Sequence, residues 1–112
     1  MLSRKYRFHS RGGVRYTYKQ GKTIRTPKLS LVHAKNSRNR QRFAVVISKK
    51  IEKTAVGRNR IRRRVYEAIR CELKDFSAKK DCIFVVYSKT LSTMPFTELR
   101  RLVRSLLEQS MV

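Results

Sequence analysis

Two apolar runs of strand length, separated by a long amphipathic segment, constrain the fold of this chain most strongly. Residues 42–48 and 81–87 are rich in Val, Ile and Phe, which predicts strands covered on both faces, the first of them central in its sheet. Between them, apolar side chains recur at helical spacing over residues 55–76, and Thr54 is a suitable N-cap. Strand, helix and strand in this order form a β-α-β unit, whose crossover is right-handed by default.

The other segments predict a small α+β domain around this unit. Residues 13–19 predict a short helix that ends before Gly21, a typical helix-terminating residue. The β-type pattern of residues 23–34 is interrupted by Pro27, which predicts a short edge strand followed by a second strand around residues 29–33, and the polar segment 35–41 predicts a hairpin loop. Pro95 should open a last helix, whose apolar stripe comprises Phe96, Leu99, Leu102, Val103, Leu106 and Leu107. We therefore expect one domain over residues 1–112, with a single mixed sheet and a basic N-terminal arm at about residues 1–12.

The balance of charges predicts a polyanionic partner. The chain has 29 Lys and Arg against 7 Asp and Glu, for a formal net charge of +22. Such a surplus repels itself unless a polyanion neutralises it, and nucleic acid is the leading candidate. A membrane is the rival, but the sequence shows no apolar run of ~18 residues, and residues 1–5 lack the apolar stretch that is typical of a signal peptide. We expect a cytoplasmic protein that binds neither a membrane nor a small-molecule substrate.

The cations are densest where the predicted long helix begins. Residues 58–64 contain five arginines, with few acids spaced to pair them. Helical phase predicts a core-facing stripe that comprises Ile61, Val65, Ala68, Ile69, Leu73 and Phe76, and an opposite side with Arg60, Arg63, Arg64, Arg70 and Lys74. Guanidinium groups can grip a phosphate with two hydrogen bonds and stack on a base. The candidate RNA-binding residues are Lys49, Lys50, Lys53, Arg58, Asn59, Arg60, Arg62, Arg63 and Arg64.

No catalytic or metal-binding constellation is visible. The seven acids form no pair suited to general acid and base catalysis. His9 and His33 are isolated, and Cys71 and Cys82 fit no zinc or redox spacing, so we expect reduced structural thiols. The protein alone should be catalytically inert, with no metal bound by the protein alone.

One set of motifs resembles a known family. Ser48-Lys49-Lys50 at the end of a buried strand, a short connector, and Arg58-Asn59-Arg60-Ile61-Arg62-Arg63 at the start of a helix are similar to the signature of the bacterial ribonuclease P protein subunit. Arg7-Phe8, Gly21 and the last amphipathic helix also occur in the expected order. The resemblance implies a two-layer α/β sandwich with a small mixed four-stranded sheet, three helices and a left-handed β-α-β crossover, against the default.

The resemblance also implies a function. Proteins of that family bind a catalytic RNA, and the complex removes the 5′ leader from precursor tRNA, with chemistry that belongs to the RNA and to Mg²⁺ bound mainly by it. A leader cleft between the first helix and the sheet is implied, and here it would draw on Val14, Tyr18, Ser30, Val32 and Ser48. Val14 stands where an aromatic is usual, so Tyr16 is a candidate to compensate.

Two other functions stay open from the residues alone. A small ribosomal protein would also be short, basic and rich in arginine helices. A sequence-specific DNA-binding protein would need base-reading side chains on one exposed helix face, and the continuous arginines argue against such readout.

Overall fold

The chain forms a mixed α+β domain around a four-stranded sheet. The structure, a computed structural model, describes residues 6–7, 11–36, 41–73 and 80–111, with the backbone alone over residues 11–15. In chain order its elements are α1 (Arg11–Gln20), β1 (Lys22–Ile24), β2 (Leu29–Lys35), β3 (Arg42–Ile47), α2 (Ala55–Glu72), β4 (Lys80–Val86), the short 3₁₀ helix η3 (Lys89–Ser92) and α3 (Phe96–Ser110). Most of the predicted N-terminal arm lies outside the described residues.

The strand order is β1-β2-β4-β3, with antiparallel β1–β2 and β2–β4 pairs and a parallel β3–β4 pair. The mixed sheet is therefore confirmed, and two details of the prediction are wrong. Segment 35–41 does not close a hairpin, because β4 lies between β2 and β3. Strand β3 is at an edge of the sheet rather than at its centre, and Arg7 makes a parallel bridge to Phe43 on that edge.

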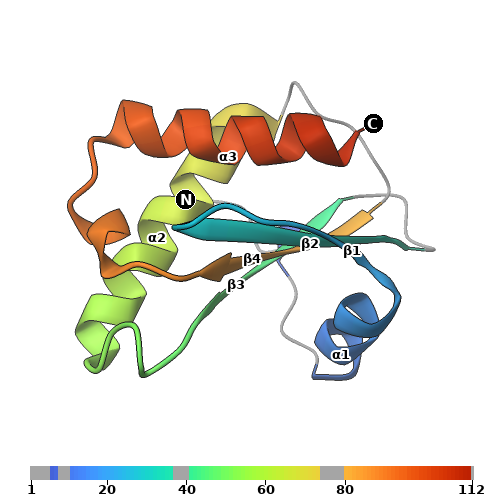
Figure 1. Ribbon diagram of the computed structural model, residues 1–112, viewed down its shortest axis with the longest axis horizontal. Helices are drawn as coiled ribbons and strands as arrows, with labels where there is room; N and C mark the ends of the chain where they lie inside the picture. Colours follow the sequence, from blue (N-terminus) through green and yellow to red (C-terminus); the bar gives the residue numbers. More distant parts are fainter. Residues whose placement is uncertain (1–5, 8–10, 37–40, 74–79, 112) are drawn as a thin grey trace.

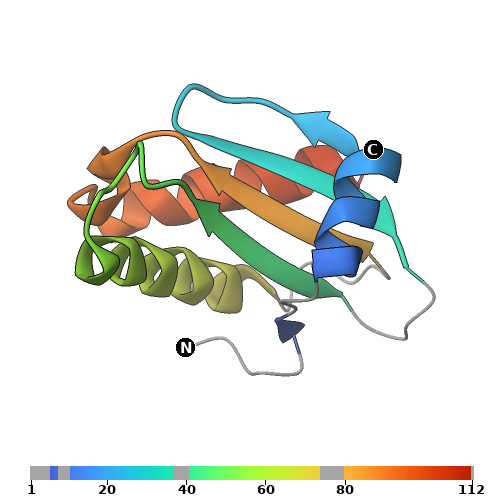
Figure 2. The same cartoon turned by 90° about the horizontal axis from the view of Figure 1, so that it is seen from below.

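The crossover from β3 through α2 to β4 is left-handed, which is rare for a β-α-β unit. Both strands point the same way, and α2 lies on the face of the sheet opposite α1 (Figure 2). Figure 2 views the sheet from its α1 side, where β4 lies to the right of β3 when both strands point up; from the side of α2, β4 therefore lies to the left of β3. The connection is therefore left-handed, so the default expectation is wrong and the hand implied by the family resemblance is correct.

Helices α2 and α3 cover one face of the sheet, and α1 crosses part of the other (Figure 1). The main core lies under α2 and α3, where Leu99, Val103, Leu106 and Leu107 of the predicted α3 stripe are buried. Strand side chains alternate between the two faces, so Val32, Ala44 and Ile83 form a smaller cluster on the α1 face. Two surfaces of different chemistry result, one at the start of α2 and one around α1.

Helix α2 follows its predicted phase. Thr54 caps it, because the Thr54 hydroxyl accepts a hydrogen bond from the Gly57 amide at 3.0 Å. The buried positions include the predicted Ile61, Val65, Ala68 and Ile69, while Leu73 is half-buried. The helix also buries Tyr66 and Glu72, which the apolar pattern did not predict. The predicted positions Lys74 and Phe76 lie outside the described residues.

Gly21, the residue after α1, is required for a steric reason. Its backbone has no left-handed conformation, so it is not the usual glycine cap. A Cβ atom at this position would lie 2.4 Å from the Thr17 carbonyl oxygen and 2.7 Å from that of His33. The close approach of two backbone segments therefore requires glycine here.

Candidate nucleic-acid interface

The start of α2 and the connector before it form a basic surface, which we call the arginine surface. It comprises Lys49, Lys50, Lys53, Arg58, Arg60, Arg62 and Arg63. Within the described ranges, Arg60 and Arg63 are exposed and make no hydrogen bond or ion pair with the protein. The same holds for the exposed ammonium groups of Lys49, Lys50 and Lys53. These five cations are free to contact an anion from outside the protein.

Other predicted residues of this surface make hydrogen bonds within the chain. The Arg58 guanidinium donates to the carbonyl oxygens of Glu52 and Lys53, at 3.0 and 2.9 Å, and so ties the connector to the helix. Arg62 donates to the Asn59 side-chain oxygen at 2.9 Å, one turn earlier. Each contact uses only part of the five donors that a guanidinium has, so both arginines can still reach a phosphate.

Arg64 differs from its neighbours. Its guanidinium donates to the Leu91 carbonyl oxygen at 2.9 Å and to the carbonyl oxygen of Met94. These contacts join α2 to the η3 region, and the side chain is only partly exposed. RNA binding by Arg64 stays a prediction, and its contacts favour a structural role.

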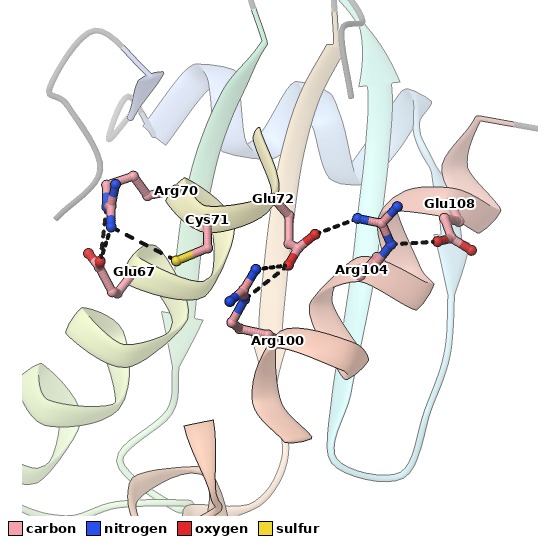
Figure 3. A network of polar contacts seen from close by, with 7 residues as sticks. All are labelled: Glu67, Arg70, Cys71, Glu72, Arg100, Arg104 and Glu108. Atoms are coloured by element: carbon pink, nitrogen blue, oxygen red, sulfur yellow. Dashed lines mark hydrogen bonds and ion pairs between the residues drawn. The ribbon is translucent and has the colours of Figure 1, made fainter. Parts of the chain in front are cut away.

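Several acids of the described chain pair with cations outside the arginine surface. Glu72 is 4% exposed and pairs with Arg100 at 2.9 Å and with Arg104 at 2.7 Å (Figure 3). Elsewhere, Glu67 pairs with Arg70 in the second half of α2, and Asp81 pairs with Arg42. These three acids therefore make no ion pair with a cation of the arginine surface.

Glu52 lies within the connector of the arginine surface, between Lys50 and Lys53, and its carboxylate supports the helix cap. Its carboxylate accepts hydrogen bonds from the Thr54 amide and hydroxyl, both at 3.1 Å. These bonds lower the pKa of Glu52, with a smaller effect from the charges of Lys89 and Arg58. The carboxylate therefore stabilises the connector without forming a direct ion pair with an arginine.

The predicted leader cleft is divided by α1. Thr17 is fully buried against the sheet, and successive residues are ~100° apart on a helix, so Tyr16 and Tyr18 lie on opposite flanks of α1. Tyr18 is half-exposed, and its pKa is raised by partial burial and by the nearby Tyr87. Tyr16 instead lines a pocket with His33 on the other flank. The two tyrosines therefore belong to separate sites.

The remaining cleft residues differ in exposure. Ser30 and Val32 are buried in β2, and Ser48 is exposed just after β3. The side chain of Val14 lies outside the described residues. Sequence reasoning missed Tyr87, which is 43% exposed and is near enough to Tyr18 for its charge to raise the pKa of Tyr18. The apolar run of β4 suggested a core strand, and only the position of the final Tyr one residue past that strand could have indicated an exposed ring.

The described residues contain neither a cluster of three or more His, Cys, Asp and Glu side chains suited to a metal ion nor a helix long and apolar enough to span a membrane. Both cysteines are free, and burial raises the pKa of Cys82 to about 12. Cys82 therefore stays a protonated, buried thiol at neutral pH.

Comparison with known proteins identifies the family. The model of the ribonuclease P family matches residues 2–111. The chain belongs to this family. It is 34% identical to the ribonuclease P protein component of Chloroflexus aurantiacus over 97% of this chain and 80% of that protein, and 32% identical to that of Roseiflexus castenholzii over 97% and 88%. As a member, it is the protein component of an endoribonuclease that acts in tRNA processing, and its partner is the RNA subunit of that enzyme.

Solved structures show the same fold. The Staphylococcus aureus ribonuclease P protein superposes with a TM-score of 0.80 at 22% identity, covering 94% of each chain. The Thermotoga maritima protein gives a TM-score of 0.82 at 22% identity, covering 92% of this chain and 96% of that one. Family membership sets aside the ribosomal and DNA-binding alternatives.

Proposed function

We propose that this chain binds the catalytic RNA of ribonuclease P through the arginine surface and helps to hold the 5′ leader of precursor tRNA for removal. The observation that carries the proposal is the set of exposed cations at the start of α2 and in its connector, which make no ion pair with an acid of the described chain. Arginines in this setting bind phosphates bidentately, and the positive end of the α2 dipole adds to the attraction. The same residues are those that match the family signature.

The chemistry of cleavage belongs to the RNA in this proposal. Hydrolysis of the phosphodiester bond uses Mg²⁺ bound mainly by the RNA partner. The protein contributes positive charge, which lowers the repulsion between RNA phosphates and so reduces the Mg²⁺ concentration that the complex needs. The predicted cytoplasmic location stays a prediction.

The leader strand is assigned to the flank of α1 that carries Tyr18. Tyr18 and Tyr87 are both half-exposed, and Tyr87 is near enough to influence the pKa of Tyr18, so they offer aromatic rings to unpaired bases. Ser48 is exposed at the end of β3, at the start of the connector that leads to the arginine surface. A strand that stacks on the two rings can therefore continue toward the RNA-bound end of α2.

The proposal is tested by reconstitution at low Mg²⁺. The chain is mixed with the catalytic RNA subunit, and cleavage of precursor tRNA is measured against the RNA alone. We expect the protein to increase cleavage at Mg²⁺ concentrations where the RNA alone is slow. A complex that cleaves no faster than the RNA would refute the proposal, provided that the protein shows native circular dichroism.

A further inference from the structure

Glu52 is an acid inside the cationic connector between β3 and α2. It lies among three exposed lysines, which we call the connector lysines and which are Lys49, Lys50 and Lys53. A carboxylate next to a phosphate-binding surface repels the phosphates, so on charge alone Glu52 should weaken the binding of RNA. The contacts of Glu52 indicate the opposite effect.

The side chain and backbone of Glu52 hold both ends of this connector. One carboxylate oxygen accepts hydrogen bonds from the amide and the hydroxyl of Thr54, both at 3.1 Å. The Thr54 hydroxyl in turn accepts a hydrogen bond from the Gly57 amide, which joins the carboxylate to the first turn of α2. The Glu52 amide donates to the Ser48 carbonyl oxygen at 3.2 Å, and the Glu52 carbonyl oxygen accepts from the Arg58 guanidinium at 3.0 Å. The conformation of the connector therefore depends on this one residue.

Gly57 leaves the space in which the Glu52 carboxylate lies. Its backbone is helical and has no positive φ, so no turn conformation requires a glycine there. A Cβ atom at this position would lie 2.5 Å from Cδ of Glu52 and 2.8 Å from its Oε2. Glycine is a much poorer helix former than alanine. The glycine at this helical position is therefore explained by the place of the Glu52 side chain.

We propose that Glu52 is a positioning residue that increases the affinity for RNA, because it holds the connector in the conformation that presents the connector lysines. The proposal rests on the RNA-binding function proposed above. A connector that is ordered before binding loses less conformational freedom on binding. This gain outweighs the repulsion between one partly exposed carboxylate and the phosphates, which salt screens. The hydrogen bonds from Thr54 lower the pKa of Glu52, so the acceptor is an ionised carboxylate at neutral pH.

The first test compares neutral variants of Glu52 in the binding of the catalytic RNA, measured by fluorescence anisotropy with the full chain. Glu52→Ala removes the charge and the acceptor, and we expect about fivefold weaker binding, the size of one net hydrogen bond, although the net charge rises. Glu52→Gln keeps an acceptor oxygen for Thr54 and should bind within about twofold of the unaltered protein or more tightly. Glu108→Ala is the matched control, because it removes an exposed acid that pairs with Arg104, and it should change the affinity by less than about twofold.

The second test displaces the Glu52 carboxylate without a change of charge. Gly57→Ala places a methyl group where the carboxylate lies, so it should break the hydrogen bonds to Thr54 and weaken RNA binding about threefold to fivefold. The melting temperature should stay within about 2 °C, because alanine is the better helix former. In an NMR titration, the pKa of Glu52 should return toward 4.5. A loss of affinity without a loss of stability is not expected of a residue with a structural role alone.

The two substitutions should also be coupled. In the Glu52→Ala background, Gly57→Ala should cause no further loss of affinity, because the side chain that it displaces is absent. The proposal is overturned if Gly57→Ala weakens binding equally with and without Glu52. It is also overturned if Glu52→Ala binds the catalytic RNA as tightly as the unaltered protein, or if Glu52→Gln loses as much affinity as Glu52→Ala.

Failure of the proposed function gives a different pattern. Normal binding of the catalytic RNA by Arg60→Ala/Arg63→Ala would reject the arginine surface itself. Weaker binding by that variant together with unchanged binding by every Glu52 and Gly57 variant would reject only the role of Glu52.

Discussion

The two ends of α2 use the same residue type in opposite ways. At the start, Arg60 and Arg63 are exposed and unpaired within the described chain. In the second half, Arg70 pairs with Glu67, and Glu72 binds two arginines that come from α3. Arginine content alone therefore does not locate an RNA-binding surface on this helix. The positions of the few acids do, because they decide which cations are already neutralised.

The contrast between the two ends of α2 requires one continuous helix. The substitution Ile61→Asp should unfold the domain and, with it, this helix. Ile61 is fully buried against the sheet, so an aspartate there places an unpaired charge in the core. We expect a loss of more than about 4 kcal/mol in the free energy of unfolding. Thermal denaturation followed by circular dichroism measures it, with Arg60→Asp as an exposed neighbouring control that stays folded. A native melting curve for Ile61→Asp would mean that the helix face is assigned wrongly.

Removing the acid at the end of α2 tests the stabilising side of the comparison. Glu72→Ala deletes charged hydrogen bonds to both Arg100 and Arg104, and we expect a loss of about 2–3 kcal/mol in the free energy of unfolding. RNA affinity should not change. Glu108→Ala is the matched control, because Glu108 binds Arg104 from an exposed position and such a pair contributes only about 0–1 kcal/mol. Equal losses of unfolding free energy in the two variants would show that the burial of Glu72 adds nothing to the stability of its ion pairs.

Most elements were predictable from the sequence because local pattern determines them. The Thr54 cap, the α2 stripe through Ile61 and Val65, and the Leu stripe of α3 all follow from period and capping chemistry. Strand neighbours depend on contacts distant in sequence. Turn formers between β2 and β3 suggested a hairpin, yet β4 pairs between those strands, and nothing local to residues 35–41 encodes that pairing.

The candidate site shows the same limit. Charge density predicted the arginine surface, but the role of Arg64 depends on carbonyl groups of the η3 region, almost thirty residues later. Glu72 was unpredictable for the same reason, since its partners come from another helix. The separation of Tyr16 from Tyr18 was predictable from helix geometry. Side chains two residues apart on a helix lie ~200° apart around its axis, and so they point to opposite flanks.

Removing the unpaired arginines tests the binding side of the comparison. Arg60→Ala/Arg63→Ala should weaken binding of the catalytic RNA about tenfold and flatten the dependence of log K on log salt by about 0.7–0.9 per lost phosphate contact. Stability should change by no more than about 0.5 kcal/mol, because both side chains are exposed. The control Arg101→Ala/Lys28→Ala removes two exposed cations elsewhere. A control with the same loss of affinity would show that net charge, not position, drives binding.

The smallest effect is expected at Arg70, which is paired and exposed. Its hydrogen bond to Glu67 is the largest cause that lowers the pKa of Glu67 from 4.5 to about 2. Because that pKa is depressed in the folded protein, any stability from the pair is present above about pH 4.5 and is lost as the pH falls toward 2. Arg70→Ala should raise the pKa of Glu67 toward 4.5 in an NMR titration and leave affinity for the catalytic RNA within about twofold. A loss of affinity as large as that of Arg60→Ala/Arg63→Ala would extend the RNA-binding surface along the whole helix and remove the contrast between its two ends.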